Sequence, residues 1–264
     1  MCGKLTAYII AFLFMGSAQI AGNPPSDIGK NADAKRYKEP LELAAKFMSG
    51  DCEEVPEGLY GIQEMRINPE DGEVISWEQV REMVGYAFYD FDGDGVKELV
   101  IGSNIIPYIG SPHKTMILAL YRMSDGKPKL LLSGTRQNSW FYQDNGYFYM
   151  TGEESAACVV SGVFSYRNNQ LCCEHYWFSG LDSEGDLEYY HSYEGTTDPE
   201  KGTKLSYTMD TYNMNDENNL GQTQCLDLTP FSSIMVYQSR KLTVFKQRYN
   251  TVITLFKRRD ADSE

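Results

Sequence analysis

Turn dipeptides separate short aromatic and β-branched segments along the middle of this 264-residue chain, and this alternation constrains its fold most. The dipeptides are Asp125-Gly126, Asn145-Gly146 and Asn168-Asn169. Each consists of residue types that tolerate the positive φ angles of tight hairpin turns. The segments that flank them cover residues 116–123, 128–132, 140–142, 147–150, 159–166 and 171–178. Because strands joined by such short turns run antiparallel, the sequence predicts a β-meander.

Similar segments extend the predicted sheet in both directions. Residues 86–89 and 99–102 precede the meander, and residues 187–193 and 204–209 follow it, before a polar loop expected at residues 213–219. We therefore expect about eight to ten antiparallel strands, closed as a sandwich or an open barrel. No segment recurs at a fixed period, which weakens a solenoid or a full propeller.

Helical signals lie on both sides of the predicted sheet, so the expected fold class is α+β. Pro40 suits the first turn of a helix that ends near Gly50, with apolar residues at helical spacing between them. Ser76 and Gln79 form a capping box that begins a second helix. An apolar stripe over residues 242–256 predicts a C-terminal helix.

The first residues have the features of a secretory signal peptide. Lys4 precedes an uncharged apolar run at residues 5–15, and small residues suit cleavage after Ala18. An uncleaved anchor is the alternative, and no later segment approaches the length of a membrane span. We therefore expect a secreted or extracellular protein, with association to the cell surface left open.

The predicted organisation has five parts. They are a signal peptide (residues 1–18), a flexible tether (19–39), a helical segment (40–85), the β-meander domain (86–230) and a basic amphipathic helix (231–264). The last part carries seven Lys and Arg residues against three acids. We favour docking of this helix on the acidic domain, and binding to an anionic surface is the alternative.

Composition limits the classes of partner that we expect. The formal net charge is -13, from 24 Lys and Arg against 37 Asp and Glu. Binding to nucleic acid requires a basic surface, so nucleic acid is not expected as a partner. Removal of the signal peptide leaves five cysteines without zinc-binding spacing: Cys52, Cys158, Cys172, Cys173 and Cys225. We favour buried thiols over a disulfide framework.

One acidic segment carries definite chemistry. Residues 90–98 read Asp-Phe-Asp-Gly-Asp-Gly-Val-Lys-Glu, which matches the D-x-D-x-D-G pattern of calcium loops. Carboxylates at alternating positions can surround one hard cation, and Gly95 permits the turn that returns the later ligands. The predicted Ca²⁺ ligands are the side chains of Asp90, Asp92, Asp94 and Glu98 and the carbonyl of Val96. The competing interpretation is an acidic surface turn without a metal.

Strand-like segments flank this loop, whereas helices flank the loop of an EF-hand. The twelfth position of an EF-hand loop requires Glu, and Ile101 stands there. The loop instead resembles the calcium loop of FG-GAP repeats, as in integrin α-chain propellers, with Glu98 where those repeats usually place Asp. This resemblance implies a calcium-bound turn between two strands. It covers only the loop and its flanking strands and occurs once, so it does not imply a propeller.

A longer stretch resembles a group of exported proteins. Residues 86–102, then Tyr121 and residues 125–131, are similar to secreted proteins and lipoproteins of Gram-positive gut bacteria. Those proteins follow a helical N-terminal part with such a loop and a β-meander. The resemblance implies export and calcium binding, and it says nothing about catalysis.

Two weaker signals have simpler explanations. The acids of residues 182–188 alternate around a glycine, and we favour a polar hairpin turn over a second cation site. The three histidines, His113, His175 and His191, lie in unrelated sequence contexts, and we expect none of them to be a ligand or a catalytic base.

Two classes of function compete. The leading hypothesis is a non-enzymatic extracellular binding or interaction module, stabilised by a structural calcium ion, with a glycan or a protein as partner. The alternative is a secreted hydrolase that acts on glycan or peptide through acidic residues. A glycan-binding module that uses Trp140 or Trp177 on an open aromatic face is a third hypothesis.

Overall fold

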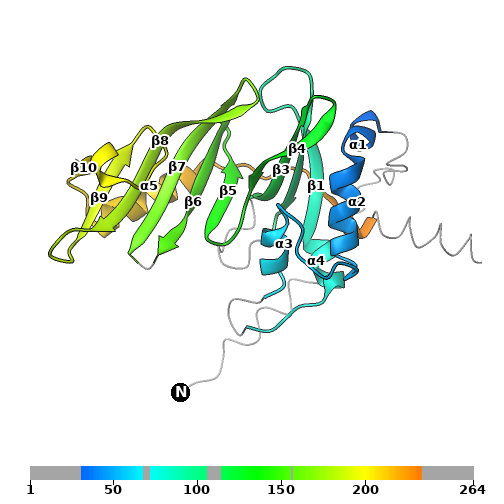
Figure 1. Cartoon of the computed structure of the whole chain (residues 1–264), viewed down its shortest axis with the longest axis horizontal. Helices are drawn as coiled ribbons and strands as arrows, with labels where there is room; N and C mark the ends of the chain where they lie inside the picture. The colour runs from blue at the N-terminus through cyan, green and yellow to red at the C-terminus, as the bar shows by residue number, and fades with distance from the viewer. Residues whose placement is uncertain (1–30, 68–71, 106–113, 156, 234–264) are drawn as a thin grey trace, which may run out of the picture.

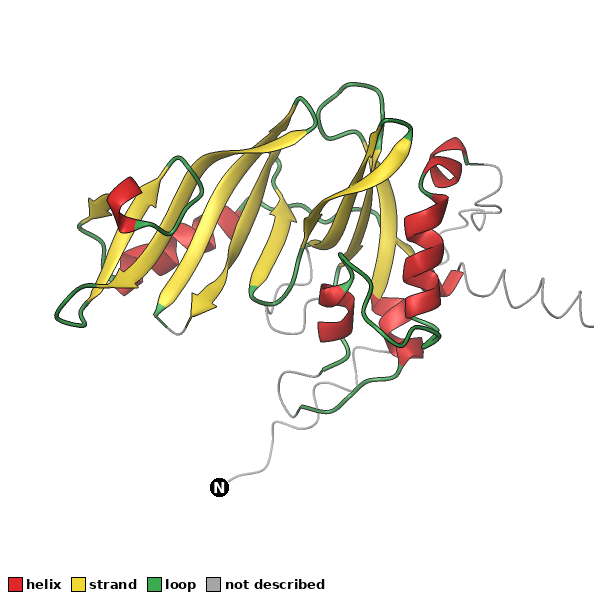
Figure 2. Cartoon of the chain, in the orientation of Figure 1, coloured by secondary structure: helices red, strands yellow, loops and turns green. Residues whose placement is uncertain are grey.

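An antiparallel sheet of eleven strands runs through the computed structural model, which describes residues 31–67, 72–105, 114–155 and 157–233 (Figure 1). The strands are β1 (Val84–Tyr89), β2 (Glu98–Ser103), β3 (Met116–Ser124), β4 (Lys127–Ser133), β5 (Asn138–Tyr142), β6 (Tyr147–Ser155), β7 (Cys158–Arg167), β8 (Gln170–Leu181), β9 (Leu187–Ser192), β10 (Thr203–Leu205) and β11 (Thr229–Pro230). The helices are α1 (Ala32–Arg36), α2 (Lys38–Phe47), α3 (Tyr60–Glu64), α4 (Trp77–Met83), α5 (Met209–Gly221) and the 3-10 helix η1 (Pro199–Lys201). Figure 2 distinguishes the two kinds of element by colour.

Most strands pair with their neighbours in the sequence. The order across the sheet is β10-β9-β8-β7-β6-β5-β3-β2-β1-β11, and β4 also pairs with β3. β4 and β5 follow one another along the same edge of β3, because Ala119 pairs with Ser133 of β4 and Ile117 pairs with Trp140 of β5. The strands form one open sheet with β10 and β11 at its ends. The predicted α+β fold with an antiparallel meander is confirmed, in this open form.

Two of the three predicted hairpin turns have the expected backbone, whereas at Asn145-Gly146 only Gly146 has a positive φ, of 87°. Asp125 and Gly126, between β3 and β4, have φ angles of 54° and 75°. Asn168 and Asn169, between β7 and β8, have φ angles of 53° and 62°. A two-residue turn with positive φ at both positions matches the right-handed twist of the strands that it joins.

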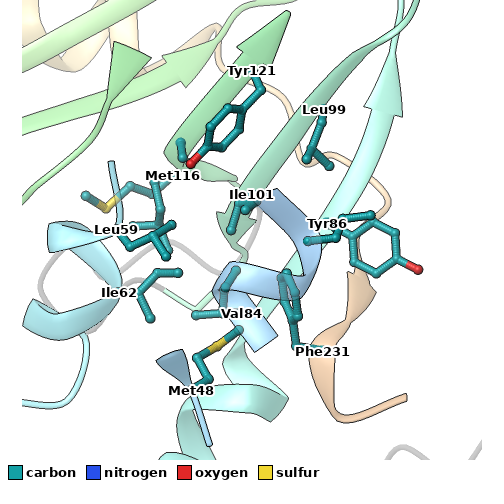
Figure 3. Close-up of a cluster of buried hydrophobic side chains, with 14 of the residues drawn as sticks. Met48, Leu59, Ile62, Val84, Tyr86, Leu99, Ile101, Met116, Tyr121 and Phe231 are labelled. Atoms are coloured by element: carbon teal, nitrogen blue, oxygen red, sulfur yellow. The ribbon is translucent and has the colours of Figure 1, made fainter. Parts of the chain in front are cut away.

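Helices cover one face of the sheet. α2, α3 and α4 lie at the end formed by β1–β3, and α5 lies behind the other end (Figure 1). Beneath them is a buried apolar cluster, which we call the helix-side cluster. Figure 3 shows part of it: Met48, Leu59, Ile62, Val84, Tyr86, Leu99, Ile101, Met116, Tyr121 and Phe231. Tyr149 of β6 belongs to the same cluster, and its hydroxyl donates a hydrogen bond to Asp216 of α5.

The opposite face of the sheet carries a second buried cluster, which we call the loop-side cluster. Val100 belongs to it, whereas its neighbours Leu99 and Ile101 belong to the helix-side cluster, as the alternation of side chains along a strand requires. Its buried members are Phe91, Val100, Ile117, Leu120, Leu132, Tyr142, Phe148, Tyr166 and Leu226. Phe91 comes from the β1–β2 loop, so this loop takes part in covering the second face.

The N-terminal capping signal is confirmed in detail. Oγ of Ser76 accepts a hydrogen bond from the backbone N–H of Gln79 at 3.3 Å, and the Gln79 side chain accepts one from the Ser76 N–H at 3.0 Å. This reciprocal capping box begins α4 at Trp77.

The predicted tether is partly wrong. Residues 31–39 fall within the range 19–39, yet they form α1 and the beginning of α2. Asn31 caps α1 by accepting a hydrogen bond from the N–H of Asp33. Tyr37 is fully buried in the helix-side cluster, and its burial fixes a segment whose charged residues suggested a flexible chain.

The polar loop expected at residues 213–219 is also wrong, because these residues belong to α5. The side chain of Thr208 caps this helix by accepting the N–H of Thr211 at 3.3 Å. Tyr212 is its single fully buried anchor, and the Tyr212 hydroxyl donates to Ser161 of β7 at 3.2 Å. Contacts with the sheet therefore stabilise a helix whose own sequence has almost no apolar stripe.

Three predicted segments fall mainly outside the described residues. These are the signal peptide at residues 1–18, the rest of the tether at residues 19–30, and residues 234–264 of the predicted C-terminal helix. Phe231, the first residue of the predicted C-terminal helix, is among the described residues and is fully buried in the helix-side cluster.

The step from β4 to β5 depends on a glycine. A Cβ atom added at Gly134 would overlap the carbonyl oxygen of Ile117 in β3, and one added at Gly61 of α3 would overlap the carbonyl oxygen of Gly134. The backbone at Gly134 therefore approaches β3, and the backbone at Gly61 approaches Gly134, at distances that only glycine permits.

We predict that Gly134→Ala lowers the free energy of unfolding by about 1–3 kcal/mol, because the added methyl group forces the backbone apart. Urea denaturation measures this change. Gly180→Ala in β8 is the matched control, since a Cβ there meets no atom within 4 Å, and it should change stability much less. Equal effects of the two substitutions would contradict the close approach at Gly134.

Candidate metal centre

The acidic loop joins two paired strands. Its flanking segments are β1 and β2, which pair antiparallel with Tyr89 opposite Glu98 as the last pair before the loop. Gly93 and Gly95 have φ angles of 72° and 85°, a backbone conformation that favours glycine. The strands on both sides confirm that the loop does not belong to a helix–loop–helix unit.

Backbone N–H groups hold the loop carboxylates in place. The N–H of Gly95 donates to Oδ2 of Asp90 at 3.0 Å, and the N–H of Asp94 donates to Oδ1 of Asp92 at 3.3 Å. The N–H of Val96 donates to Oδ1 of Asp94 at 2.7 Å. These bonds curl the loop around its own acidic side chains.

Three of the predicted ligands converge. One carboxylate oxygen each from Asp90, Asp92 and Glu98 lie within 4.8 Å of one another. Oδ1 of Asp90 is buried and accepts no hydrogen bond in the described part of the chain. A buried acceptor without a donor is costly, and a cation among these oxygens would satisfy it. The three carboxylates therefore form a candidate metal site.

The other two predicted ligands lie outside this group of three. Asp94 is exposed, and its Oδ1 accepts the N–H of Val96. Val96 is half-buried. Ligation by the Asp94 side chain and by the Val96 carbonyl stays a prediction.

Glu98 is the most deeply buried acid of the site, with 1% of its surface exposed. Its Oε2 accepts the N–H of Phe91 at 3.2 Å, and its Oε1 lies 3.4 Å from the hydroxyl of Tyr166. Burial is the main cause that raises the pKa of Glu98 to about 7, and repulsion from Asp92 and Asp94 adds to it. Burial likewise raises the pKa of Asp92. Without a cation, the site therefore disfavours its own negative charge.

Phe91 connects the loop to the core. Its ring packs edge-on against Tyr142 of β5, with ring centroids 4.6 Å apart, and lies 5.0 Å from Phe148 of β6. Because Phe91 stands between Asp90 and Asp92, the position of the carboxylates and the position of the ring are linked. The same loop thus places acids at the candidate metal site and the Phe91 ring in the loop-side cluster.

Two tyrosines at the site were not identified from the sequence. Tyr166 approaches Glu98 from β7, and the hydroxyl of Tyr37, between α1 and α2, donates to the carbonyl of Lys97 at 2.8 Å. Both lie far from the loop along the chain. No local pattern around either residue indicates this role, because the sheet and the helix packing bring them there.

The second group of alternating acids forms a polar turn, as expected. Oδ1 of Asp182 accepts the N–H groups of Glu184 and Asp186, both at 2.9 Å, in the β8–β9 connection. Glu188 pairs with Lys204 of β10. These acids are used within the hairpin itself.

The five cysteines of the described residues are not cross-linked. Cys52, Cys158, Cys172, Cys173 and Cys225 are free thiols in the described residues, and four of them are half-buried. The expected burial of these thiols is wrong for Cys225, which is exposed, and only partial for the other four.

Comparison of the chain with protein-family models, with curated proteins and with solved structures finds no significant match. Among the described residues, every helix is too short or too polar to cross a membrane.

We predict a pH dependence of stability for the metal-free protein. The folded-state pKa of Glu98 lies above the unfolded value of 4.5, so its proton stabilises the fold at low pH and this contribution is lost as the pH rises through about 7. With chelator present, the free energy of unfolding of the wild type should therefore fall by on the order of 1–3 kcal/mol between pH 5 and pH 8, relative to that of Glu98→Gln.

Urea denaturation at several pH values measures this difference. Glu53→Gln is the control, because it makes the same substitution at an exposed acid. If the difference in free energy of unfolding between the wild type and Glu98→Gln does not change with pH, ionisation of Glu98 does not destabilise the fold.

Proposed function

We propose that the protein is an exported, non-enzymatic binding or interaction module whose fold is stabilised by one structural calcium ion. The observation that carries the calcium proposal is the convergence of Asp90, Asp92 and Glu98, with a buried and unpartnered oxygen on Asp90. A glycan or a protein outside the cell is the proposed partner.

The chemistry of the ligands favours a hard cation. All three converging groups are carboxylates, the ligand type that Ca²⁺ and Mg²⁺ prefer. Oxygens on opposite sides of a Ca²⁺ ion lie about 4.6–5.2 Å apart, whereas Mg²⁺ requires about 4.0–4.2 Å. The three oxygens lie within 4.8 Å of one another, a limit that either ion satisfies. The resemblance of the loop to FG-GAP calcium loops favours Ca²⁺.

The proposed role of the ion is structural. Neutralisation of the acids would let Asp90 and Asp92 remain close together and keep Phe91 in the loop-side cluster. A ligand that binds only the folded state stabilises it by mass action, by about 2.7 kcal/mol at a concentration of 100 times the dissociation constant. Calcium is abundant outside cells, so a site of weak affinity is sufficient there.

We predict that Ca²⁺ raises the melting temperature of the wild type and binds with measurable heat in calorimetric titration, after removal of metal by chelator. Asp92→Asn should weaken Ca²⁺ binding by at least about tenfold, because affinity depends on the number of charged ligands. Mg²⁺ should bind more weakly than Ca²⁺ to the wild type.

Asp182→Asn is the matched control for the calcium titration. It removes one carboxylate charge from an acidic turn and keeps the oxygen that accepts the two N–H groups. This variant should respond to Ca²⁺ as the wild type does. If millimolar Ca²⁺ neither releases heat nor shifts the melting temperature of the wild type, the calcium proposal is wrong.

Export is the second part of the proposal, and the N-terminal sequence supports it. We predict that a Gram-positive host that expresses the full chain releases a protein beginning at Gln19, as determined by N-terminal sequencing. Leu13→Asp, which interrupts the apolar run, should keep the protein in the cell. Recovery of the full chain from the membrane would instead indicate an uncleaved anchor.

A further inference from the structure

Two of the three histidines meet on the surface, although their sequence contexts are unrelated. His175 lies on β8 and His191 lies on β9, next to it in the sheet (Figure 1). Trp177 pairs directly with His191 across the two strands, so His175 is the diagonal neighbour of His191 on the same face. Nδ1 of His175 lies 3.1 Å from Nε2 of His191. This site is separate from the acidic loop and has no part in the proposed calcium binding.

The distance between the two nitrogens suits a shared metal ion. Zinc binds imidazole nitrogen at about 2.0–2.1 Å, which places two ligand nitrogens about 2.9 Å apart at a right angle and about 3.3 Å apart at the tetrahedral angle. The observed 3.1 Å falls between these two values. We propose that His175 and His191 bind one divalent transition-metal ion, such as Zn²⁺ or Ni²⁺, through Nδ1 of His175 and Nε2 of His191, with water completing its coordination.

Neighbouring rings hold both imidazoles in position. The ring of His175 stacks on Trp177 with an interplanar angle of 19° and a centroid distance of 5.5 Å. The ring of His191 meets Tyr193 edge-on at 4.6 Å and lies 5.4 Å from Trp177. Because both ligands stand on paired strands and are packed against aromatic rings, little ordering is needed when an ion binds.

The site is accessible and its ligands can be neutral. His175 is exposed and His191 is half-buried, so an ion can reach both rings from solvent. Burial, together with the neighbouring His175, lowers the pKa of His191, which favours the uncharged imidazole that metals require. In the absence of metal, these two nitrogens form a hydrogen bond, with one imidazole as donor and the other as acceptor.

The nature of the ligands separates this site from the calcium loop. Imidazole nitrogen suits Zn²⁺, Ni²⁺ and Cu²⁺, whereas Ca²⁺ takes oxygen ligands. The two sites therefore bind different classes of ion. Failure of one proposal leaves the other unaffected, because Asp92 and the histidine pair lie on different hairpins.

The test is a titration of the untagged full chain with Ni²⁺ at pH 7.5, followed by tryptophan fluorescence. Ni²⁺ bound at the pair would lie beside Trp177 and quench its emission, so we expect saturable quenching in the wild type. His175→Gln and His191→Gln should each weaken this binding by at least about tenfold, since a single imidazole cannot chelate. Trp177→Phe should lose the quenching and keep the binding when calorimetry is used instead.

Two control variants and one protection experiment test whether the ion binds at the histidine pair. His113→Gln, which removes the histidine outside the described residues, should bind Ni²⁺ as the wild type does, and so should Asp92→Asn. In the wild type, Zn²⁺ should protect His175 and His191 from acylation by diethyl pyrocarbonate, mapped by mass spectrometry, so the result does not depend on a variant that folds poorly. Unchanged quenching in both histidine variants, or acylation of both residues at the same rate with and without Zn²⁺, would overturn the proposal.

Discussion

A carboxylate with almost no access to solvent stands at the first residue of β2, and the loop-side layer is arranged around it. Glu98 reaches Phe91 through a backbone hydrogen bond and approaches Tyr166 of β7, so one acid links the loop to a strand on the far side of β5 and β6. Burial of its charge is unfavourable unless a proton or a cation accompanies it. Through Phe91, the loop that this acid holds packs over Phe148 and Tyr142.

Local signals predicted the elements that local interactions stabilise. The turn at Asn168-Asn169 and the capping box at Ser76 depend on a few consecutive residues, and the structure contains both. α5 and the helical end of the predicted tether, residues 31–39, were missed for the opposite reason. Each is held by a tyrosine, Tyr212 in α5 and Tyr37 after α1, whose burial against the sheet outweighs a polar surrounding sequence. Sequence spacing does not reveal which tyrosine will meet a strand.

In the acidic site, too, the features that depend on consecutive residues were predictable and those that depend on long-range packing were not. The alternating acids and Gly95 predicted a curled loop between strands, and Asp90, Asp92 and Glu98 do converge. The depth at which Glu98 is buried was not predictable, because Phe91, Tyr166 and the covering strands determine it together. The histidine pair was not predictable from the sequence. His175 and His191 become neighbours through the register of β8 and β9, which only the paired strands define.

The open sheet has terminal strands at its two ends and a further outer edge at β4, and the composition of these strands has a consequence for how the protein behaves at high concentration. A long, flat edge strand offers unpaired N–H and C=O groups on which another chain can add a strand. β10 has three residues, one of them Lys204, and β11 has two, of which Pro230 lacks an N–H group. The two terminal strands therefore present short ladders to another molecule. The outer edge of β4 is longer, but it carries Lys127, Pro128 and Lys129, residue types that disfavour pairing with a further strand.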